Sequence, residues 1–317
     1  MRFSASINKQ QAHPIIHLKD KEMGCSATIY AFGGLLNAFT IPINNKIINC
    51  IWGYQSVAEA RKTIAESFAG AKLSPFVCRM RDGIFRWNEK NYKVHKHYLG
   101  AHALHGLVYD MVYDILQMEA TNEYATVVLS KKYTATDQGY PFPYSIELKW
   151  TLEKNNHLSI TTTVRHENKE AIPYADGWHP YFSLGGKIDD YTLQFDAIQK
   201  IIFDDALLPT GALQKDDRFE NGLLLKDISL DNSFILNPKA PADIILSNKN
   251  VTLHVHPSSA YPILQVYTPL HRHSIALENL SGAPNNFNNQ IGLLVLEPNK
   301  DYSFSTAYKL SPPLLNN

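Results

Sequence analysis

The chain has 317 residues, and its 30 Lys and Arg residues balance its 30 Asp and Glu residues. A chain of this length can bury a large hydrophobic core. A neutral chain lacks the basic surface that nucleic acids and anionic membranes normally need, so we expect neither as a partner.

The first residues, MRFSASINKQQAHPII, do not contain the apolar stretch of a signal peptide. No segment of the sequence approaches the ~20 consecutive apolar residues of a membrane-spanning helix. We therefore expect a cytoplasmic protein. The cysteines Cys25, Cys50 and Cys78 form no CxxC pair, and their spacing predicts buried free thiols rather than a disulfide framework.

The segment SVAEARKTIAESF predicts a short helix near residues 56–69. Ser56 is followed by Glu59 at the spacing of a capping box, which satisfies free backbone N–H groups at a helix start. Gly70 is suited to end the helix. Apolar residues recur every fourth position and predict one buried face: Ala60, Ile64 and Phe68.

The rest of the chain shows the alternation of apolar and polar residues that is typical of β-strands. Short strands are predicted over 125–129 and 191–195. A longer alternation over 144–164, interrupted by the turn Lys154-Asn155-Asn156, predicts a β-hairpin. A second hairpin is predicted over 244–255, with its turn at Asn248-Lys249-Asn250.

The sequence contains no internal repeat, no low-complexity tract and no linker. We therefore expect a single domain over residues 1–317. Its class is all-β, mostly antiparallel, with two large sheets packed face to face and the predicted helix in a connection between strands.

Among the histidines, His179 has the most constrained surroundings. It lies in DGWHPYFSLGG, where Pro180 restricts its backbone to an extended conformation. Trp178, Tyr181 and Phe182 offer flat apolar surface next to it. An imidazole held on a rigid turn among aromatic rings suits acid–base chemistry on a sugar. His105, directly before Gly106, is a second candidate.

Glu278 follows the apolar residues Ile275, Ala276 and Leu277, as at the end of a buried strand. A buried carboxylate is costly unless it is paired or functional, so both a catalytic role and a structural role bonded to loop amides remain open. The composition of the segments around Arg79 and Asp231 indicates only ordinary surface charges. Gln265 carries no signal by itself.

In chain order, several motifs together resemble the aldose 1-epimerase family, the galactose mutarotases and their relatives. The matching segments are FGGLLNAF at 32–39, RMRDGIFRWNEKNY from Arg79, LHG at 104–106, HPYF at 179–182, LDNSF around Asp231, QVYTP from Gln265 and the loop at Glu278. HPYF is moderately specific, and the ordered set is specific.

The resemblance implies a galactose mutarotase-like β supersandwich and an isomerase that acts on a small sugar, an aldohexose such as galactose or glucose. It implies that Glu278 is the base and His179 the acid. It also implies sugar-positioning roles for the following residues: Arg79, His105, Asp231 and Gln265. The chain departs from the family at Cys78 and Met80, where many members carry Asn and a β-branched residue, and at Tyr109 and Asp110, where glycine is common. These departures bear on the preferred sugar.

Exchange of anomers requires one proton to leave the C1 hydroxyl and another to reach the ring oxygen, followed by rotation and closure. One carboxylate and one imidazole suffice, and each contributes about 10²–10⁴-fold. We expect Glu278 to start ionised, His179 to start protonated, and the pH dependence to be bell-shaped. The reaction needs no organic cofactor and no metal.

Other interpretations remain. His271, His273 and Glu278 form an H-x-H-x4-E string that resembles part of a cupin metal motif, but the flanking glycines of that motif are absent. A sugar-binding module without catalysis could use the same fold. Within the epimerases, a hexose-6-phosphate 1-epimerase would need a basic phosphate pocket, for which Arg79 and Arg81 are candidates.

Overall fold

A computed structural model of the protein describes residues 1–8, 13–239 and 241–313. Its largest layer is a nine-stranded sheet in the order β12-β13-β14-β15-β29-β25-β24-β19-β22. The strand bounds are β12 Asp114–Ala120, β13 Tyr124–Tyr133, β14 Tyr144–Glu153, β15 His157–Arg165, β29 Tyr302–Ser311, β25 Thr252–Pro257, β24 Ile244–Ser247, β19 Thr192–Gln194 and β22 Leu223–Leu224.

A second, eight-stranded sheet carries the candidate site. Its order is β21-β20-β23-β26-β27-β17-β6, and β18 pairs with β27 beside β17. The strand bounds are β21 Pro209–Gln214, β20 Ala197–Phe203, β23 Asp231–Leu236, β26 Ile263–Tyr267, β27 Ile275–Leu280, β17 Gly177–His179, β6 Ala71–Leu73 and β18 Tyr181–Phe182.

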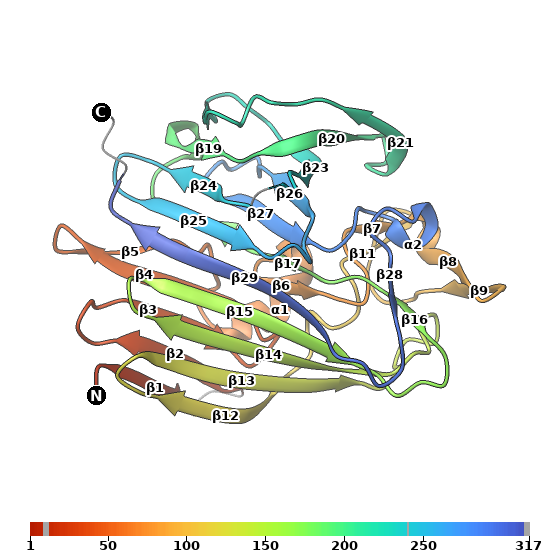
Figure 1. The fold of residues 1–317 in the computed structure, drawn as a ribbon, viewed down its shortest axis with the longest axis horizontal. Coiled ribbons are helices and arrows are strands. Elements are labelled where there is room, and N and C mark those ends of the chain that lie inside the picture. Colours follow the sequence, from red (N-terminus) through yellow and green to blue (C-terminus); the bar gives the residue numbers. More distant parts are fainter. Residues whose placement is uncertain (9–12, 240, 314–317) are drawn as a thin grey trace.

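A five-stranded sheet at the N-terminus, in the order β1-β2-β3-β4-β5, packs its first two strands against β12, β13 and β14. Figure 1 shows this sheet in red behind the nine-stranded one. Its strands are β1 Phe3–Asn8, β2 Ile15–Asp20, β3 Ser26–Tyr30, β4 Leu36–Ile43 and β5 Lys46–Asn49. Gly33 and Gly34 of the FGGLLNAF motif form the turn between β3 and β4, both with positive φ.

Three small ladders complete the β-sheets of the described residues, and one of them, β10-β11-β7, contributes residues to the candidate site. They are β10-β11-β7, with bounds Tyr98–Leu99, His102–Leu104 and Arg79–Met80; β8-β9, with bounds Ile84–Trp87 and Lys90–Lys93; and β16-β28, with bounds Ile172–Tyr174 and Leu294–Leu296. The printed strand pairs are antiparallel throughout the large sheets, as the sequence predicts.

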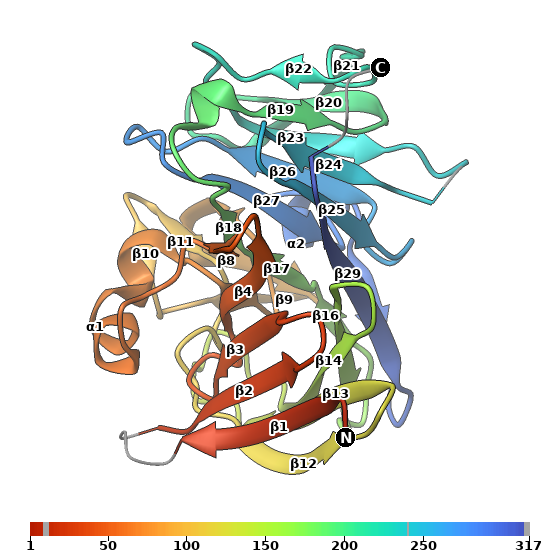
Figure 2. The same cartoon turned by 90° about the vertical axis from the view of Figure 1, so that its left-hand side faces the viewer.

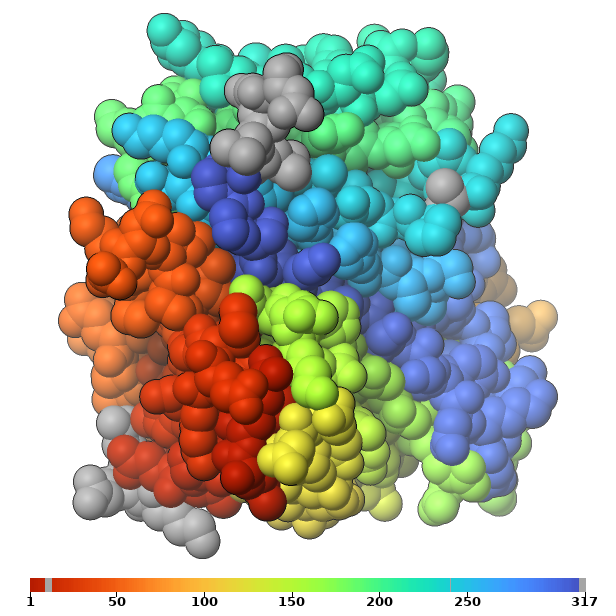
Figure 3. Space-filling model, turned by 60° about the vertical axis from the view of Figure 1, so that its left-hand side comes forward, coloured from red at the N-terminus to blue at the C-terminus, as the bar shows by residue number. Residues whose placement is uncertain are grey.

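The eight- and nine-stranded sheets face each other across an aromatic core. Trp178 of β17 lies edge-on to Trp150 of β14, with ring centroids 5.7 Å apart, and Phe182 of β18 meets Tyr308 of β29 at 5.8 Å. The face-to-face packing expected from the sequence is confirmed. Figure 3 shows β29, in dark blue, at the surface between the green β14–β15 region and the cyan β24–β25 region.

Both predicted hairpins are confirmed. In the first hairpin, Ser145 of β14 pairs with Arg165 of β15 at one end, and Glu153 pairs with His157 next to the turn. In the second hairpin, Ile244 of β24 pairs with Val255 of β25 at one end, and Ser247 pairs with Thr252 next to the turn. Asn155 and Asn156 adopt the positive φ values that their turn requires. Buried and exposed residues alternate along β14, so one face of the strand packs into the core.

The predicted helix is α1, Val57–Ser67, which lies beside β10 and β11 in Figure 2. Ser56 Oγ accepts a hydrogen bond from the Glu59 N–H at 3.1 Å, as the capping pattern predicts. The predicted end at Gly70 is wrong: the helix ends at Phe68, which takes a left-handed conformation at φ 56°. The second helix is the short α2, Asn286–Asn289. No helix in the described ranges is long and apolar enough to cross a membrane.

Candidate active site

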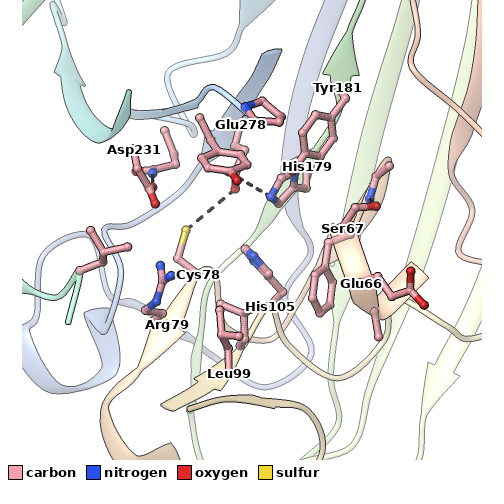
Figure 4. A pocket seen from close by; sticks show the side chains of 18 of the residues that line it. Glu66, Ser67, Cys78, Arg79, Leu99, His105, His179, Tyr181, Asp231 and Glu278 are labelled. Atoms are coloured by element: carbon pink, nitrogen blue, oxygen red, sulfur yellow. Dashed lines mark hydrogen bonds and ion pairs between the residues drawn. The ribbon is translucent and has the colours of Figure 1, made fainter. Parts of the chain in front are cut away.

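A cavity of about 350 Å³ opens on the face of the eight-stranded sheet that points away from the aromatic core. Its wall includes every site residue that the sequence suggested: Arg79, His105, His179, Asp231, Gln265 and Glu278. Further wall residues come from the end of α1, from the β10-β11-β7 ladder, and from loops and strands that include Trp52 and Tyr267. Figure 4 shows these side chains converging from separate elements.

The floor of the cavity is one cross-strand row of the sheet. Ser233 of β23 pairs with Gln265 of β26, and Gln265 pairs with Glu278 of β27. The register that pairs Gly177 with Leu280 continues to bring His179 of β17 opposite Glu278. Because directly paired residues point to the same face, neighbouring strands deliver the row's side chains to one place.

A second row runs parallel to the first, two residues along each strand. Asp231 pairs with Tyr267, Tyr267 pairs with Ala276, and Ala276 pairs with Tyr181 of β18. The rows are linked diagonally, because Gln265 Nε2 donates to Asp231 Oδ1 at 2.6 Å. The two rows therefore form a continuous floor with polar groups at one end and aromatic rings at the other.

His179 lies on a strand and not on the rigid turn that the sequence suggested. Strand alternation sends its neighbours Trp178 and Phe182 into the core. Of the three aromatic neighbours that the sequence suggested, Tyr181 is the one that lines the cavity. The rings of His179 and Tyr181 stack with centroids 4.9 Å apart, and the His105 ring meets His179 edge-on at 4.9 Å. These rings fix the imidazole from both sides.

His179 and Glu278 form a buried pair, with His179 Nε2 3.3 Å from Glu278 Oε1. Burial lowers the pKa of His179 to about 3. Burial also raises the pKa of Glu278 well above its usual range; the negative charge of Asp231 adds to that rise, and Arg79 opposes it. Both shifts act against the charged states expected from the sequence.

Together, the two shifts favour a pair that carries a single proton. Whether that proton is on Glu278 or on His179, the pair is neutral overall, and the two forms differ only by its transfer across the 3.3 Å contact. An additional proton or the loss of the shared one would leave a net charge in a buried place, which costs free energy.

Glu278 lies in the middle of β27, whose residues are all buried, and not at a strand end as expected. Its other oxygen, Oε2, accepts a long contact of 3.9 Å from the Cys78 thiol. Gln265 has a fixed orientation, because its Oε1 accepts from Ser233 Oγ while its Nε2 donates to Asp231. Burial raises the pKa of Asp231 as well.

Arg79 and His105 come from the β7–β11 ladder, where Arg79 pairs with Leu104. The loops around them have unusual backbones: Cys78 and His105 both have positive φ, 48° and 60°. The His105 N–H donates to the Cys78 carbonyl at 3.0 Å. Such conformations are uncommon away from glycine and persist where surrounding contacts enforce them.

Sequence reasoning did not assign a site role to several cavity residues. Cys78 was noticed as a buried thiol and as a departure from the family pattern next to Arg79, and Phe68 only as part of the helix stripe. Phe68 packs on His105 with ring centroids 4.6 Å apart. Trp52, 44% exposed, lies at the cavity wall and stacks on His271 at 5.2 Å. No local pattern marks these residues, because only the tertiary fold brings them to the cavity.

The described part of the chain contains two groups of donors that could hold a metal ion: Cys78, His105 and Glu278, and Asp243, His254 and His256. Neither includes His271 or His273. Those imidazoles stack on each other, at 5.9 Å between centroids, and on Trp52. The cupin-like arrangement considered from the sequence is therefore not formed.

Together, the sheets and the buried imidazole–carboxylate pair in a polar cavity define a supersandwich protein of the galactose mutarotase-like class. The family model described as aldose 1-epimerase matches residues 14–309. The chain belongs to the aldose 1-epimerase family.

Relatives agree on the fold. An uncharacterized protein, YihR of Escherichia coli K12, is 29% identical over 244 residues, which are 74% of this chain and 76% of that protein. An aldose epimerase homologue from C. elegans superposes with a TM-score of 0.84 at 21% identity, covering 96% of this chain and all of that one. A galactose 1-epimerase from Lactobacillus acidophilus has a TM-score of 0.83 at 20% identity, over 99% and 100% of the two chains.

Proposed function

We propose that the protein is an aldose 1-epimerase that interconverts the α and β anomers of a free aldohexose. The observation that carries this proposal is the contact of 3.3 Å between His179 Nε2 and Glu278 Oε1 at the floor of a polar cavity. Family membership supports the reaction type, whereas the sugar is inferred from the cavity.

In the reaction, Glu278 takes the proton of the C1 hydroxyl and His179 gives a proton to the ring oxygen, which opens the ring. Rotation about C1–C2 then presents the other carbonyl face, and closure reverses both transfers. At the start of the reaction, His179 and Glu278 must together carry one proton. Burial of the pair favours this state, because it is neutral overall. The nearby charge of Arg79 lowers the pKa of Glu278 and so favours the carboxylate that acts as base.

The rest of the floor suits a sugar ring. Asp231 and Gln265 offer hydrogen-bonding groups in a fixed orientation, and Arg79 supplies a charged donor to hydroxyl oxygens. Tyr181 and Tyr267 supply the aromatic end of the second row, against which the apolar face of the ring can lie. His105 packs against His179 and limits its movement.

A phosphorylated hexose is the less favoured substrate, because the described cavity wall carries Arg79 against the acidic residues Glu66, Asp231 and Glu278. Arg81, the second candidate for a phosphate, does not line the cavity; its guanidinium forms an ion pair with Asp204 at 3.1 Å. A dianionic phosphate would therefore meet more negative charge than positive charge.

Polarimetry of freshly dissolved α-glucose, α-galactose and α-glucose 6-phosphate tests the proposal. We expect the protein to speed the rotation change of at least one free hexose more than that of the phosphate ester. Preference for the phosphate would favour the hexose-6-phosphate 1-epimerase. Saturable sugar binding without any faster rotation change would favour a carbohydrate-binding protein and contradict the proposal.

A further inference from the structure

Cys78, His105 and Glu278 bring three different metal-binding atoms together in the cavity. Their ligand atoms all lie within 4.8 Å of one another, and all three residues are buried. They come from separate elements: Cys78 directly precedes β7, His105 directly follows β11, and Glu278 lies in β27. Figure 4 shows the thiol and the His105 ring directed toward the Glu278 carboxylate.

Two of these donor residues have polar atoms whose hydrogen bonds within the described protein are absent or weak. In the described chain, Nδ1 of His105 is buried without a hydrogen-bond partner. The Cys78 thiol reaches Glu278 only at 3.9 Å, a weak contact. Buried polar atoms are normally paired, so the unpartnered imidazole nitrogen of His105 is a group whose hydrogen-bonding need the described protein leaves unmet.

The backbone holds the donors in place. Cys78 and His105 both have left-handed backbones, and the 3.0 Å hydrogen bond from the His105 N–H to the Cys78 carbonyl ties the two loops together. The Phe68 ring packs on His105. A site whose ligands are fixed before binding loses less entropy when the ion arrives.

The local charge also favours a cation. The negative charge of Asp231 disfavours a charged Glu278 carboxylate, and the positive charge of Arg79 opposes that effect. A divalent ion bound between Glu278 and a Cys78 thiolate would compensate that negative charge. Thiolate, imidazole and carboxylate are together a donor set for Zn²⁺ and for softer ions such as Cd²⁺, in a tetrahedron that leaves one position for water.

We propose that Cys78, His105 and Glu278 form an inhibitory site for Zn²⁺ and related soft divalent cations. On binding, the Cys78 S–H proton leaves to solvent, and the proton shared by His179 and Glu278 passes to His179 or to solvent. Bonds then form from the metal to sulfur, to an imidazole nitrogen and to a carboxylate oxygen. Glu278 then no longer accepts a proton from a sugar, so metal and sugar compete. The inhibition, but not the binding, rests on the proposed function.

Binding is tested without any activity measurement, by titrating the protein with Cd²⁺ and recording the sulfur-to-metal charge-transfer absorption in the ultraviolet. We expect one ion per chain. Cys78→Ser should abolish the band and weaken binding at least about 100-fold, since loss of even a supporting partner costs about 10–100-fold. Cys50→Ser, which alters another buried thiol, is the matched control and should keep the band.

Both variants are compared by thermal melting, so that a folding defect is recognised. A second donor group consists of the exposed Asp243 and the half-buried His254 and His256. All titrations are therefore carried out in a His254→Gln/His256→Gln background, which removes this second binding site. A band that survives Cys78→Ser, or that disappears in Cys50→Ser, would overturn the proposed site.

The inhibition is tested by polarimetry with and without Zn²⁺. We expect Zn²⁺ to raise KM for the sugar without changing kcat, and EDTA to restore the initial rate. Metal that binds through Cys78 but leaves KM unchanged would overturn the inhibitory role. A protein that shows the Cys78-dependent band but has no mutarotase activity would support the metal site and contradict the proposed function instead.

Discussion

Trp178 and His179 are consecutive residues of β17 that serve opposite faces of the same sheet. His179 faces the cavity, whereas Trp178 packs against Trp150 in the core and lies under the Lys72 ammonium group, 4.8 Å from its ring centroid. Lys72 in turn forms an ion pair with Asp176, and neither side chain is exposed. The buried Lys72–Asp176 ion pair therefore lies behind the candidate site, in contact with the residue that directly precedes His179.

Breaking that pair is expected to destabilise the protein. Lys72→Met leaves the Asp176 carboxylate buried without its cation, at a cost of about 3–5 kcal/mol in the free energy of unfolding. The exposed pair Lys215–Asp217, 80% and 57% exposed, is the control, and Lys215→Met should leave the free energy of unfolding nearly unchanged. Urea denaturation measures both. If both variants lose the same free energy of unfolding, burial of the Lys72–Asp176 pair does not make its loss more destabilising.

Removing either member of the candidate catalytic pair is expected to abolish most activity in a folded protein. His179→Asn and Glu278→Gln should each lower kcat at least about 10²-fold, because each deletes a proton-transfer group. His157 and Glu153 form an exposed pair of the same residue types, at 2.9 Å. The control variants His157→Asn and Glu153→Gln should keep full activity in polarimetry. Near-normal rates in either cavity variant would refute the assignment.

The pH dependence is expected to be bell-shaped with widely separated limbs. As the pH falls toward the His179 pKa of about 3, the pair gains a second proton and activity is lost. As the pH rises through the raised pKa of Glu278, the shared proton leaves and activity is lost again. The rate kcat/KM is measured from about pH 3 to about pH 10, with the uncatalysed rate subtracted.

Asp231→Asn should move the alkaline limb of this profile to lower pH, since the charge of Asp231 raises the pKa of Glu278. Asp217→Asn removes an exposed carboxylate, outside the cavity wall, and should move nothing. An unchanged alkaline limb in Asp231→Asn would argue that this limb reports a group other than Glu278.

Trp52 is expected to contribute to sugar binding at the cavity mouth. Trp52→Ala should raise KM about 2- to 10-fold with little change in kcat, as expected for loss of a stacking contact worth about 0.5–1.5 kcal/mol. Leu270, 98% exposed, provides the control, since Leu270→Ala removes an apolar side chain outside the cavity wall. If both variants bind sugar like the unaltered protein, Trp52 is not part of the binding surface.

Local patterns predicted the local structure well. The alternation over β14–β15 and β24–β25 predicted both hairpins, and Ser56 predicted the start of α1. The end of α1 was wrong because Phe68 takes a left-handed conformation that its own sequence disfavours, and its packing on His105 supports it. That contact lies far along the chain, where no window around the helix contains it.

The site was predicted as a set of residues but not as a geometry. Single residues such as Gln265 gave no signal, and only the ordered family resemblance brought them together. The pKa shifts of His179 and Glu278 could not be predicted from the sequence, because they arise from burial, which is a property of the fold and opposes both of the expected charges. The proximity of Cys78 to Glu278 likewise depends on loops whose positive φ values the sequence did not indicate.

The two parallel rows of the cavity floor have a consequence for how this scaffold can vary. A one-residue insertion or deletion in β26 or β27 would turn Gln265 or Glu278 to the other face of the sheet, because side chains alternate along a strand. Point substitutions in the second row, at Tyr267 or Tyr181, leave the ladder register intact. We therefore expect the scaffold to tolerate side-chain exchanges in the cavity floor better than length changes in the same strands.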